Sequence, residues 1–498
     1  MTDVAVTEAA APEAQPAAQP ADAVAGRKAR PQPGRQAVVI IHGMGEQRPM
    51  DTMRDFVKTT WGGDVVLKAR DVAGSQVWNK PDTRTGSLEL RRITTRKSQP
   101  GGAYPAGVRT DFYELYWADL TGGSTWQQFV GWVRYLLFRR WSNVPTDVRS
   151  AWLALWALSI VAVLFAVASV LPKDIWGSFA PSWLPQWPFI LVAAGLGSQI
   201  HRVATATFGR VVRYTRADPD NVAARAAVRE RGLALFKALH DSGDYDRIIV
   251  VGHSLGTILA FDLVSYFWAQ REAVGRIDEG TGEFAALVAV DRAAAALQAK
   301  PDSDTLSAYR AAQAQLRRLL SKRPPAADVA KDGRWLISDL VTVGSPLTHA
   351  EFLLAASADD LAARQNEREV ATSPPYREPL DGNALHQAKQ SGLVDGAASD
   401  CDLFAFPVKG AQQSWQLHHA APFAVVRWTN VFDPAQAIYR GDLISGPLVE
   451  NFGPGIRDID LRGIRGQSRR FSHTRYWASD APERQLSELR DALNFLDR

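Results

Sequence analysis

Short apolar runs that end in glycine or in turn-forming residues recur along the chain. The clearest reads Ala-Val-Val-Ile-Ile-His-Gly-Met-Gly at residues 37–45, and another reads Ile-Ile-Val-Val-Gly at residues 248–252. Continuous apolar runs of this length are typical of strands buried on both faces of a parallel sheet. Together with the helical stretches between the runs, they predict an α/β fold with a mostly parallel central sheet flanked by helices. Further strands are expected at residues 64–68, 87–93, 108–117, 335–346, 423–432 and 456–461.

Residues 120–216 break this pattern with two long apolar runs. Residues 151–171 carry no charge, and about 20 apolar residues suffice to cross a bilayer as a helix. The second run, at residues 183–200, is shorter in its apolar part and contains Pro185 and Pro188. Tryptophans bracket both runs, as they do in an interfacial aromatic belt. The pattern predicts a hydrophobic membrane hairpin whose second arm either spans the bilayer or is re-entrant or interfacial.

Basic residues flank the two apolar runs on both sides. The loop between the runs holds one lysine and one aspartate. Because cytoplasmic flanks of membrane segments carry the excess of Lys and Arg, the rest of the chain is expected on the cytoplasmic side. Without a bilayer, the same runs would instead form a hairpin buried under a lid, or line a hydrophobic tunnel. The flanking arginines are Arg134, Arg139, Arg140 and Arg149 before the runs, and Arg202, Arg210, Arg213 and Arg216 after them.

The changes of pattern divide the chain into six segments. Residues 1–36 are rich in Ala, Pro, Glu and Gln and have too few large apolar groups to fold, which predicts a disordered tail. This tail lacks the basic and apolar regions of a secretory signal peptide. Residues 37–119 form the first part of the α/β core. The other segments are the membrane-associated insertion (120–216), a second core segment (217–270), a helical insertion that forms a cap or a lateral layer (271–334, with helices near 284–299 and 305–321) and the rest of the core (335–498).

The overall charge and the cysteine content narrow the choice of partner and compartment. Lys and Arg number 57 against 53 Asp and Glu, a net charge of +4. This mild imbalance predicts no nucleic-acid partner and favours a membrane surface as the anionic partner. Cys401 is the only cysteine, so the chain has no intrachain disulfide, Cys-based metal cluster or Cys-x-x-Cys redox pair. Such cysteine usage fits a reducing compartment.

The apolar run before residue 252 leads into Gly-His-Ser-Leu-Gly at residues 252–256, and a helix-like stretch begins at Thr257. A strand, a sharp turn and a helix around G-x-S-x-G form the context of a nucleophile elbow. Gly252 and Gly256 suit a turn that leaves no room for side chains, and the helix N-terminus favours negative charge beside Ser254. Ser254 is therefore a candidate nucleophile. The alternative is an ordinary strand-to-helix turn that happens to contain a serine.

The elbow and four further motifs resemble those of lipase/esterase-like serine hydrolases of the α/β-hydrolase superfamily. The other motifs are His-Gly at 42–43, Gly-Ser-Pro at 344–346, an acidic loop after the strand at 423–432, and Ser-His at 472–473. They are spread over residues 37–477 but make up a small fraction of them, and both insertions lie outside the common core. The resemblance implies an α/β-hydrolase fold, ester hydrolysis through an acyl-enzyme, and no metal or organic cofactor.

In this superfamily the elbow serine is followed along the chain by an acid and then by a histidine. The resemblance therefore assigns Ser254 as the nucleophile and His473 as the base. Asp442 is the preferred acid, because Asp-Leu-Ile at 442–444 resembles the family's Asp-x-Val/Ile pattern. Asp433 is the alternative acid, although it precedes a proline and is also suited to capping a turn.

The resemblance also implies an oxyanion hole made of backbone N–H groups. One donor would be Met44 or Gly45, after the early His-Gly motif, and the other would be Leu255, directly after the serine. His42 itself is expected to be a structural hydrogen-bonding residue rather than a base.

These features together predict a membrane-anchored serine hydrolase that cleaves a lipid or acyl ester, with its catalytic domain on the cytoplasmic side. A thioesterase or acyltransferase would use the same triad, because the acyl-enzyme is shared. A membrane-tethered scaffold with a hydrolase-like fold and no catalysis is a rival from another class. A soluble enzyme whose apolar hairpin acts as a lid is a further alternative. The acyl group, the head group and the oligomeric state stay open.

Overall fold

The computed structural model describes most of the chain after residue 33. Met44, Gly45 and residues 1–33 of the expected tail lie outside the described residues. The structure describes residues 34–43, 49–68, 76–86, 89–121, 141, 144, 149–172, 175–176, 178, 181, 185–204, 219–326, 332–396, 401–411, 413–435, 441–442, 444–462 and 472–498.

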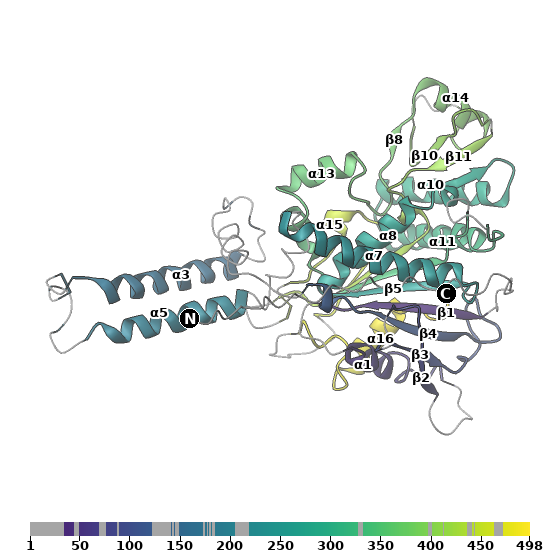
Figure 1. The fold of residues 1–498 in the computed structure, drawn as a ribbon. Helices are drawn as coiled ribbons and strands as arrows, with labels where there is room; N and C mark the ends of the chain where they lie inside the picture. The colour runs from purple at the N-terminus through teal and green to yellow at the C-terminus, as the bar shows by residue number, and fades with distance from the viewer. Residues whose placement is uncertain are drawn as a thin grey trace, which may run out of the picture.

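An eight-stranded sheet forms the centre of the molecule, with the order β13-β12-β7-β5-β1-β4-β3-β2 (Figure 1). The strands from β13 to β4 run parallel, and β3 and β2 add an antiparallel edge. The expected mixed α/β fold with a mostly parallel central sheet is therefore confirmed. The strands are β1 (Arg35–Ile41), β2 (Val77–Pro81), β3 (Arg91–Thr95), β4 (Arg109–Leu115), β5 (Arg247–His253), β7 (Ile337–Val343), β12 (Arg427–Phe432) and β13 (Ile456–Asp460).

Two expectations at the start of the core are wrong. Arg35 and Gln36 belong to strand β1 rather than to a tail, because the Arg35 guanidinium pairs with Asp111 at 2.7 Å on the neighbouring strand. The strand expected at residues 64–68 is a turn. Its cause is the Asp64 carboxylate, which accepts the backbone N–H of Val66 at 2.7 Å and so bends the chain where its apolar side chains alone suggest a strand.

Helices cover both faces of the sheet. Helices α7 (Pro219–Asp241) and α8 (Leu255–Ala269) lie on one face, and α1 (Asp51–Thr59) and α16 (Glu483–Leu493) lie on the other (Figure 1). Alternate residues of β1 point to the two layers: Val39 packs in the α7/α8 core and Val38 in the α1/α16 core. Burial on both faces explains the continuous apolar runs within β1 and β5.

The helical insertion forms a lateral layer. Helices α10 (Gly282–Ala299) and α11 (Ser303–Leu320) match the expected pair and start two residues earlier, because Thr281 and Asp302 cap their N-termini. Tyr309 on α11 donates a 2.6 Å hydrogen bond to the carbonyl of Phe423, just before β12. This contact lies at the amino end of β12, so the pair flanks the end of the sheet opposite the elbow and does not cap it.

Short elements complete the body of the molecule. A three-stranded sheet has the order β10-β11-β6, and β8 pairs with β9. These elements are η1 (Ala118–Thr121), α9 (Glu272–Gly275), β6 (Arg276–Asp278), η6 (Pro346–His349), α12 (Ala350–Leu353), α13 (Ala358–Asn366), β8 (Glu378–Pro379), α14 (Gly382–Gln390), β9 (Asp402–Leu403), β10 (Ala405–Pro407), β11 (Ser414–Leu417), η7 (Pro422–Ala424) and α15 (Val449–Phe452).

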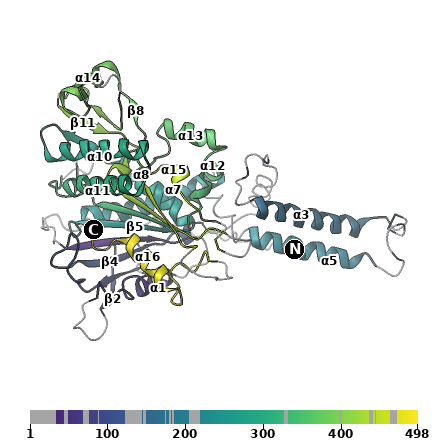
Figure 2. The same ribbon diagram turned by 180° about the vertical axis from the view of Figure 1, so that it is seen from behind.

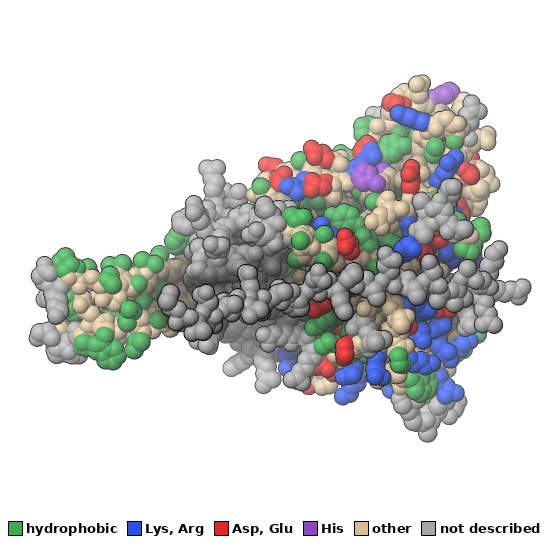
Figure 3. All heavy atoms as spheres, viewed as in Figure 1, with side chains coloured by type: hydrophobic (Ala, Val, Ile, Leu, Met, Phe, Trp, Pro, Cys, Tyr) green, Lys and Arg blue, Asp and Glu red, His purple; other side chains and the backbone are tan. Residues whose placement is uncertain are grey.

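A pair of helices, α3 (Arg149–Val170) and α5 (Trp187–Ala204), projects from the body as an extended hairpin in both views (Figures 1 and 2). Hydrophobic side chains and backbone make up its visible surface (Figure 3). Within the described residues, the stretch Trp152–Val170 of α3 is long and apolar enough to cross a membrane, and none of it is buried. The apolar part of α5, Trp187–Ser198, is shorter. The alternative of a hairpin buried in the protein is therefore wrong.

Candidate active site

The elbow motif forms a strand–turn–helix unit. Strand β5 ends at His253, helix α8 begins at Leu255, and Ser254 between them has φ 54° and ψ −130°. This conformation is strained for a residue with a side chain and is typical of functional turns. Glycine is required beside it: a Cβ on Gly252 would lie 2.6 Å from Thr257 Cα, and one on Gly256 only 2.2 Å from the carbonyl oxygen of Ile41. The sequence motif therefore has a local steric cause.

Three side chains from distant parts of the chain form a hydrogen-bonded row at this turn. The Ser254 Oγ lies 2.7 Å from Nε2 of His473, and Nδ1 of the same ring lies 2.8 Å from Oδ2 of Asp442. The three side chains follow β5, β12 and β13, and the carboxyl ends of parallel strands share one edge of the sheet. The structure thus brings together the serine, histidine and preferred aspartate expected from the sequence.

The Asp442 carboxylate is buried and held from several directions. Its Oδ1 accepts the backbone N–H of Ile444 at 2.9 Å, and its Oδ2 accepts the Tyr476 hydroxyl at 2.8 Å in addition to His473. Burial alone would raise the pKa of Asp442, but the hydrogen bonds from His473, Ile444 and Tyr476 outweigh it and lower that pKa. Asp442 is therefore ionised and fixed in orientation at neutral pH.

Asp433 occupies a different position in the same loop. It directly follows β12, and its backbone carbonyl accepts the N–H of Asp442 at 2.7 Å. The carboxylate against Nδ1 of His473 is that of Asp442. Asp433 therefore contacts the acid loop through its main chain, and the geometry favours Asp442 of the two candidates.

The expected oxyanion site is described in part. Met44 and Gly45 lie outside the described residues. Leu255 is the first residue of α8, and the first N–H groups of a helix have no acceptor within the helix. Gly43 approaches the nucleophile so closely that a Cβ there would lie 2.6 Å from Ser254 Cβ and 3.1 Å from Oγ. The backbone after β1 therefore reaches the Ser254 side chain, as an oxyanion donor must.

His42 is a structural residue, as expected. The ring is buried and stacks on Trp117 with a centroid separation of 5.4 Å. Its Nδ1 lies 2.8 Å from the carbonyl oxygen of Gly43, and Trp117 donates its indole N–H to the carbonyl of His42 at 3.0 Å. Burial lowers the pKa of His42 to about 4, so the ring is neutral and fixes the chain that leads to Gly43.

His253 and Tyr476 also support the row, and the sequence analysis missed both. The Nε2 of His253 lies 2.8 Å from the backbone carbonyl of His473, which only accepts, so this nitrogen carries the proton. Burial lowers the pKa of His253 to about 3, and its ring packs against Trp477 at 4.8 Å. Only their positions in the sequence could have indicated this role: His253 directly precedes Ser254, and Tyr476 lies three residues after His473.

Burial of histidines makes the folded protein sensitive to acid. Burial lowers the pKa of His42, His240 and His418 to about 4 and that of His253 to about 3. The unfolded chain binds these protons below about pH 6.5 while the folded chain does not, so acid favours unfolding. Burial has the opposite effect on Glu114 and Asp291, because it raises their pKa values to about 7 and about 6. As the pH falls, these two carboxyls bind protons in the folded state before they do so in the unfolded chain. At pH 5 this offsets about half of the stability that the buried histidines lose.

We therefore expect the free energy of unfolding to fall by about 4 kcal/mol between pH 7 and pH 5, since one pKa unit corresponds to about 1.4 kcal/mol. Urea unfolding at both pH values measures this difference. The variant His240→Leu should lose about 2 kcal/mol less over the same interval, because His240 is buried between Phe267 and Trp335. Equal stability at the two pH values in the unmodified protein would contradict the expectation.

Gly344, the first residue of the Gly-Ser-Pro motif, packs directly against the row. Its φ is +61°, and a Cβ there would lie 2.8 Å from the Tyr476 ring, 3.3 Å from Asp442 Oδ2 and 3.4 Å from His473 Nδ1. If the row catalyses a reaction, Gly344→Ala is expected to lower its kcat about 100-fold, because displacing a catalytic group by about 1 Å has such an effect. Gly280 has a similar φ of +73° with open space around it, so Gly280→Ala is the matched control. The kcat of both variants is measured on the same ester. An equal fall in both variants would contradict a specific effect of residue 344 on the row.

One cluster in the described part of the chain has the spacing of metal ligands. Ligand atoms of His240, Asp241 and Asp332 lie within 4.8 Å of one another. Both carboxylates already pair with arginines: Arg271 with Asp241 at 2.6 Å, and Arg334 with Asp332 at 2.8 Å. These two positive charges balance the two carboxylates, so the cluster is an ion-pair network at the amino end of β5 and β7, distant from Ser254.

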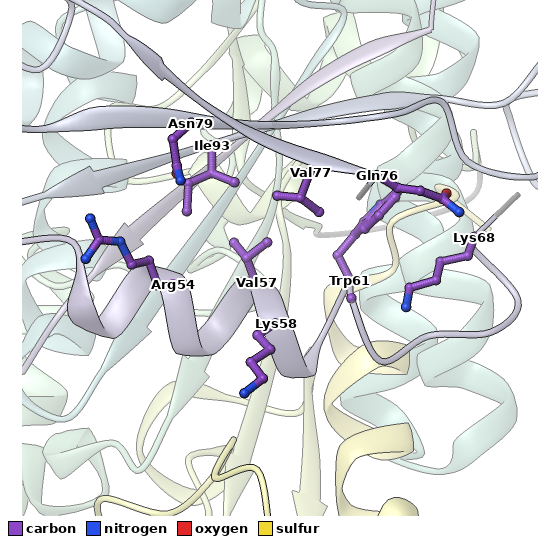
Figure 4. A pocket seen from close by; sticks show the side chains of 10 residues that line it. Arg54, Val57, Lys58, Trp61, Lys68, Gln76, Val77, Asn79 and Ile93 are labelled. Atoms are coloured by element: carbon purple, nitrogen blue, oxygen red, sulfur yellow. The ribbon is translucent and has the colours of Figure 1, made fainter. Parts of the chain in front are cut away.

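A pocket of about 370 Å³ lies between α1 and the edge strands β2 and β3 (Figure 4). Basic side chains from Arg54, Lys58 and Lys68 line it together with Trp61 and Val77. In the strand order, β2 stands four places from β5, which is about 19 Å at the usual strand spacing. The pocket is therefore separate from the Ser254 row.

No family model, no curated protein and no solved structure matches this chain. An assignment of function therefore depends on the geometry of the residues themselves. The features available are the elbow turn, the hydrogen-bonded row at its tip, and the apolar hairpin.

Proposed function

We propose that this protein is a serine hydrolase with a lipase/esterase-like α/β-hydrolase fold, anchored in a membrane, that cleaves carboxylic esters of lipids or other acyl compounds. The observation that carries the proposal is the hydrogen-bonded row of Ser254, His473 and Asp442 on a strand–turn–helix elbow. A nucleophile held by a base that is itself held by a carboxylate is the arrangement of acyl-transfer triads on several unrelated folds. Loss of any one of these three residues would have supported a scaffold without catalysis instead.

In the proposed mechanism, Ser254 Oγ attacks the ester carbonyl carbon while Nε2 of His473 takes its proton. Asp442 stabilises the imidazolium that forms and keeps the remaining proton on Nδ1. The tetrahedral oxyanion is held by the N–H of Leu255 and by that of Met44 or Gly45. His473 then returns the proton to the leaving alcohol, which leaves an acyl-enzyme. A water molecule then attacks the acyl carbon while His473 takes one of its protons. The bond between that carbon and Ser254 Oγ breaks, His473 returns the proton to Oγ, and the carboxylic acid leaves. The reaction needs no metal or organic cofactor.

The hairpin supports the proposed membrane anchor through its length and its surface. The 22 residues of α3 extend about 33 Å as a helix, against a hydrocarbon core of about 30 Å. Leu164 on α3 and Leu191 on α5 are more than half exposed, a costly arrangement in water and a favourable one in lipid. Trp152 lies near the base of the hairpin and Trp176 near its tip, as in paired interfacial belts. The arginine-rich flanks favour a cytoplasmic location for the body.

The proposal is tested by pre-steady-state kinetics on p-nitrophenyl acetate with detergent-solubilised full-length protein. A burst of p-nitrophenol close to one equivalent per chain, followed by slower turnover, is expected from an acyl-enzyme that accumulates. An acyltransferase would give the same burst, with turnover that rises on addition of an acceptor alcohol. A thioesterase would give the same burst and would release thiol from a thioester supplied as an alternative substrate. Absence of both burst and turnover in folded protein would contradict all of these enzyme assignments.

A further inference from the structure

We infer that the substrate is an acyl-ester lipid taken directly from the bilayer leaflet next to the body, without passing through water. This inference rests on the proposed function and goes beyond anchoring. It follows from the position of the hairpin relative to the nucleophile: both belong to the same edge of the central sheet.

The strand register places the start of the insertion close to Ser254. The chain leaves the sheet at the end of β4, where Leu115 is level with Ile41 of β1, and Ile41 is level with Gly252 of β5. All three strands are parallel, so they end at one edge. Two strand spacings amount to about 10 Å. The polypeptide therefore departs toward the hairpin about 10 Å from the strand that carries the nucleophile.

The return from the insertion reaches the same edge. Helix α7 ends at Asp241, at the amino end of β5, and its 23 residues extend about 34 Å. The seven residues of β5 extend only about 23 Å, so α7 begins beyond the carboxyl edge of the sheet. Both arms of the insertion therefore leave on the side of Ser254, and the hairpin projects from that end of the body (Figures 1 and 2).

Ion pairs fix α7 against the elements around this edge. The Arg231 guanidinium donates to the carbonyl of Tyr116 at 3.0 Å and pairs with Asp119 on η1 at 2.7 Å. Arg229 pairs with Asp262 of α8 at 2.7 Å. Helix α8 starts directly after Ser254, so these contacts hold α7 against the helix of the elbow and against the segment that follows β4. A bilayer that holds the hairpin consequently lies on the Ser254 side of the body.

The nucleophile is poorly accessible from bulk water. Ser254 is 4% exposed and His473 is 8% exposed, and Ser254 follows the strand end at the same sheet edge from which the chain departs toward the hairpin. Moving acyl chains from lipid into water is unfavourable for every methylene exposed. A site that opens beside the bilayer avoids this step for a long-chain ester, and a short water-soluble ester gains nothing from it.

The test compares two esters that share a leaving group. p-Nitrophenyl oleate is dissolved in phosphatidylcholine vesicles, and p-nitrophenyl acetate is dissolved in water. The variant Ile160→Arg/Leu164→Arg charges two α3 side chains that are 50% and 62% exposed. We expect its rate on vesicle-borne oleate to fall roughly 100-fold, because arginine near the centre of a bilayer is strongly disfavoured, while its rate on acetate is unchanged. The control Val65→Arg/Val66→Arg charges residues of the body that are 74% and 53% exposed and should leave both rates unchanged.

Diluting the ester within the bilayer distinguishes an enzyme that takes its substrate from the bilayer from one that is only attached to the membrane. The vesicles are made of, and diluted with, ether-linked phosphatidylcholine, which has no carboxylic ester to cleave. Adding more of this lipid at constant total oleate should lower the wild-type rate in proportion to the oleate fraction in the bilayer. Unchanged oleate turnover on dilution, or in the Ile160→Arg/Leu164→Arg variant, would overturn the inference while acetate turnover still upheld the hydrolase. Failure of the wild type on both esters would instead overturn the proposed function and the inference with it.

Discussion

Replacing Ser254 by alanine is expected to lower kcat for p-nitrophenyl acetate about 10⁵-fold, which corresponds to the loss of a nucleophile from a triad that acts as a unit. The reason is the 2.7 Å contact between Ser254 Oγ and His473 Nε2, which activates an otherwise weak alcohol nucleophile. A stopped-flow assay with saturating ester measures the change. The burst should disappear together with the steady-state rate.

The control for this substitution lies on the same helix. Ser265→Ala removes a hydroxyl from α8 well away from the elbow, and its kcat should stay within about twofold of the wild type. If Ser254→Ala keeps the burst, the nucleophile is a different residue. If Ser265→Ala loses as much activity as Ser254→Ala, the loss reflects damage to α8 rather than removal of the nucleophile.

Replacing Asp442 by asparagine is expected to lower kcat about 10⁴-fold with little change in the fold. The carboxylate accepts the proton on Nδ1 of His473. An amide nitrogen in its place would donate, which forces the ring proton to Nε2 and prevents that nitrogen from accepting the proton of Ser254. The affinity for ester should change much less, since the carboxylate is buried behind the histidine.

Asp433→Asn is the matched substitution at the other candidate acid. The backbone carbonyl of Asp433 accepts the N–H of Asp442, and asparagine retains that group. We expect kcat for Asp433→Asn within about threefold of the wild type. Steady-state kinetics of both variants decide between the two residues, and a larger loss in Asp433→Asn would reverse the assignment.

The central strands were predictable from sequence because their cause is local. Strands β1 and β5 are buried on both faces, so their side chains are apolar without alternation. The edge strand β2 (Val77–Pro81) was missed because its residues are mostly exposed and carry no such pattern. Residues 64–68 have apolar side chains, but the Asp64 carboxylate makes hydrogen bonds that determine a turn. In these segments, the hydrogen bonds of single side chains decide the local structure, and the apolar or polar composition predicts it poorly.

The candidate site was predictable where a motif carries it. Ser254 follows from glycines that the tight turn requires, and His473 from its order along the chain. The preference for Asp442 over Asp433 came from motif shape, and the structure supplies the geometric reason. The supporting role of His253 was not predictable, because its contact with the His473 carbonyl joins the end of β5 to a loop 220 residues away. Such contacts depend on how the strand ends are arranged at the edge of the sheet.

The apolar hairpin was predicted from the length of its two uncharged runs and from the tryptophans around them. Neither feature predicts its place at the same sheet edge as Ser254. That place follows from the parallel pairing of β4 with β1 and of β1 with β5. Pairing of distant strands is not encoded in any local pattern. The relation between anchor and site therefore became visible only through the strand order.

The measurement that tests the central claim most directly is labelling with a fluorophosphonate, which reacts covalently with activated serines. Full-length wild-type protein in mild detergent is labelled beside Ser254→Ala, and the modified peptide is identified by mass spectrometry. The account predicts one label per wild-type chain, on Ser254, and none on the variant. A folded wild type that takes no label, or takes it on another serine, would contradict the assignment of Ser254, His473 and Asp442 as a working triad.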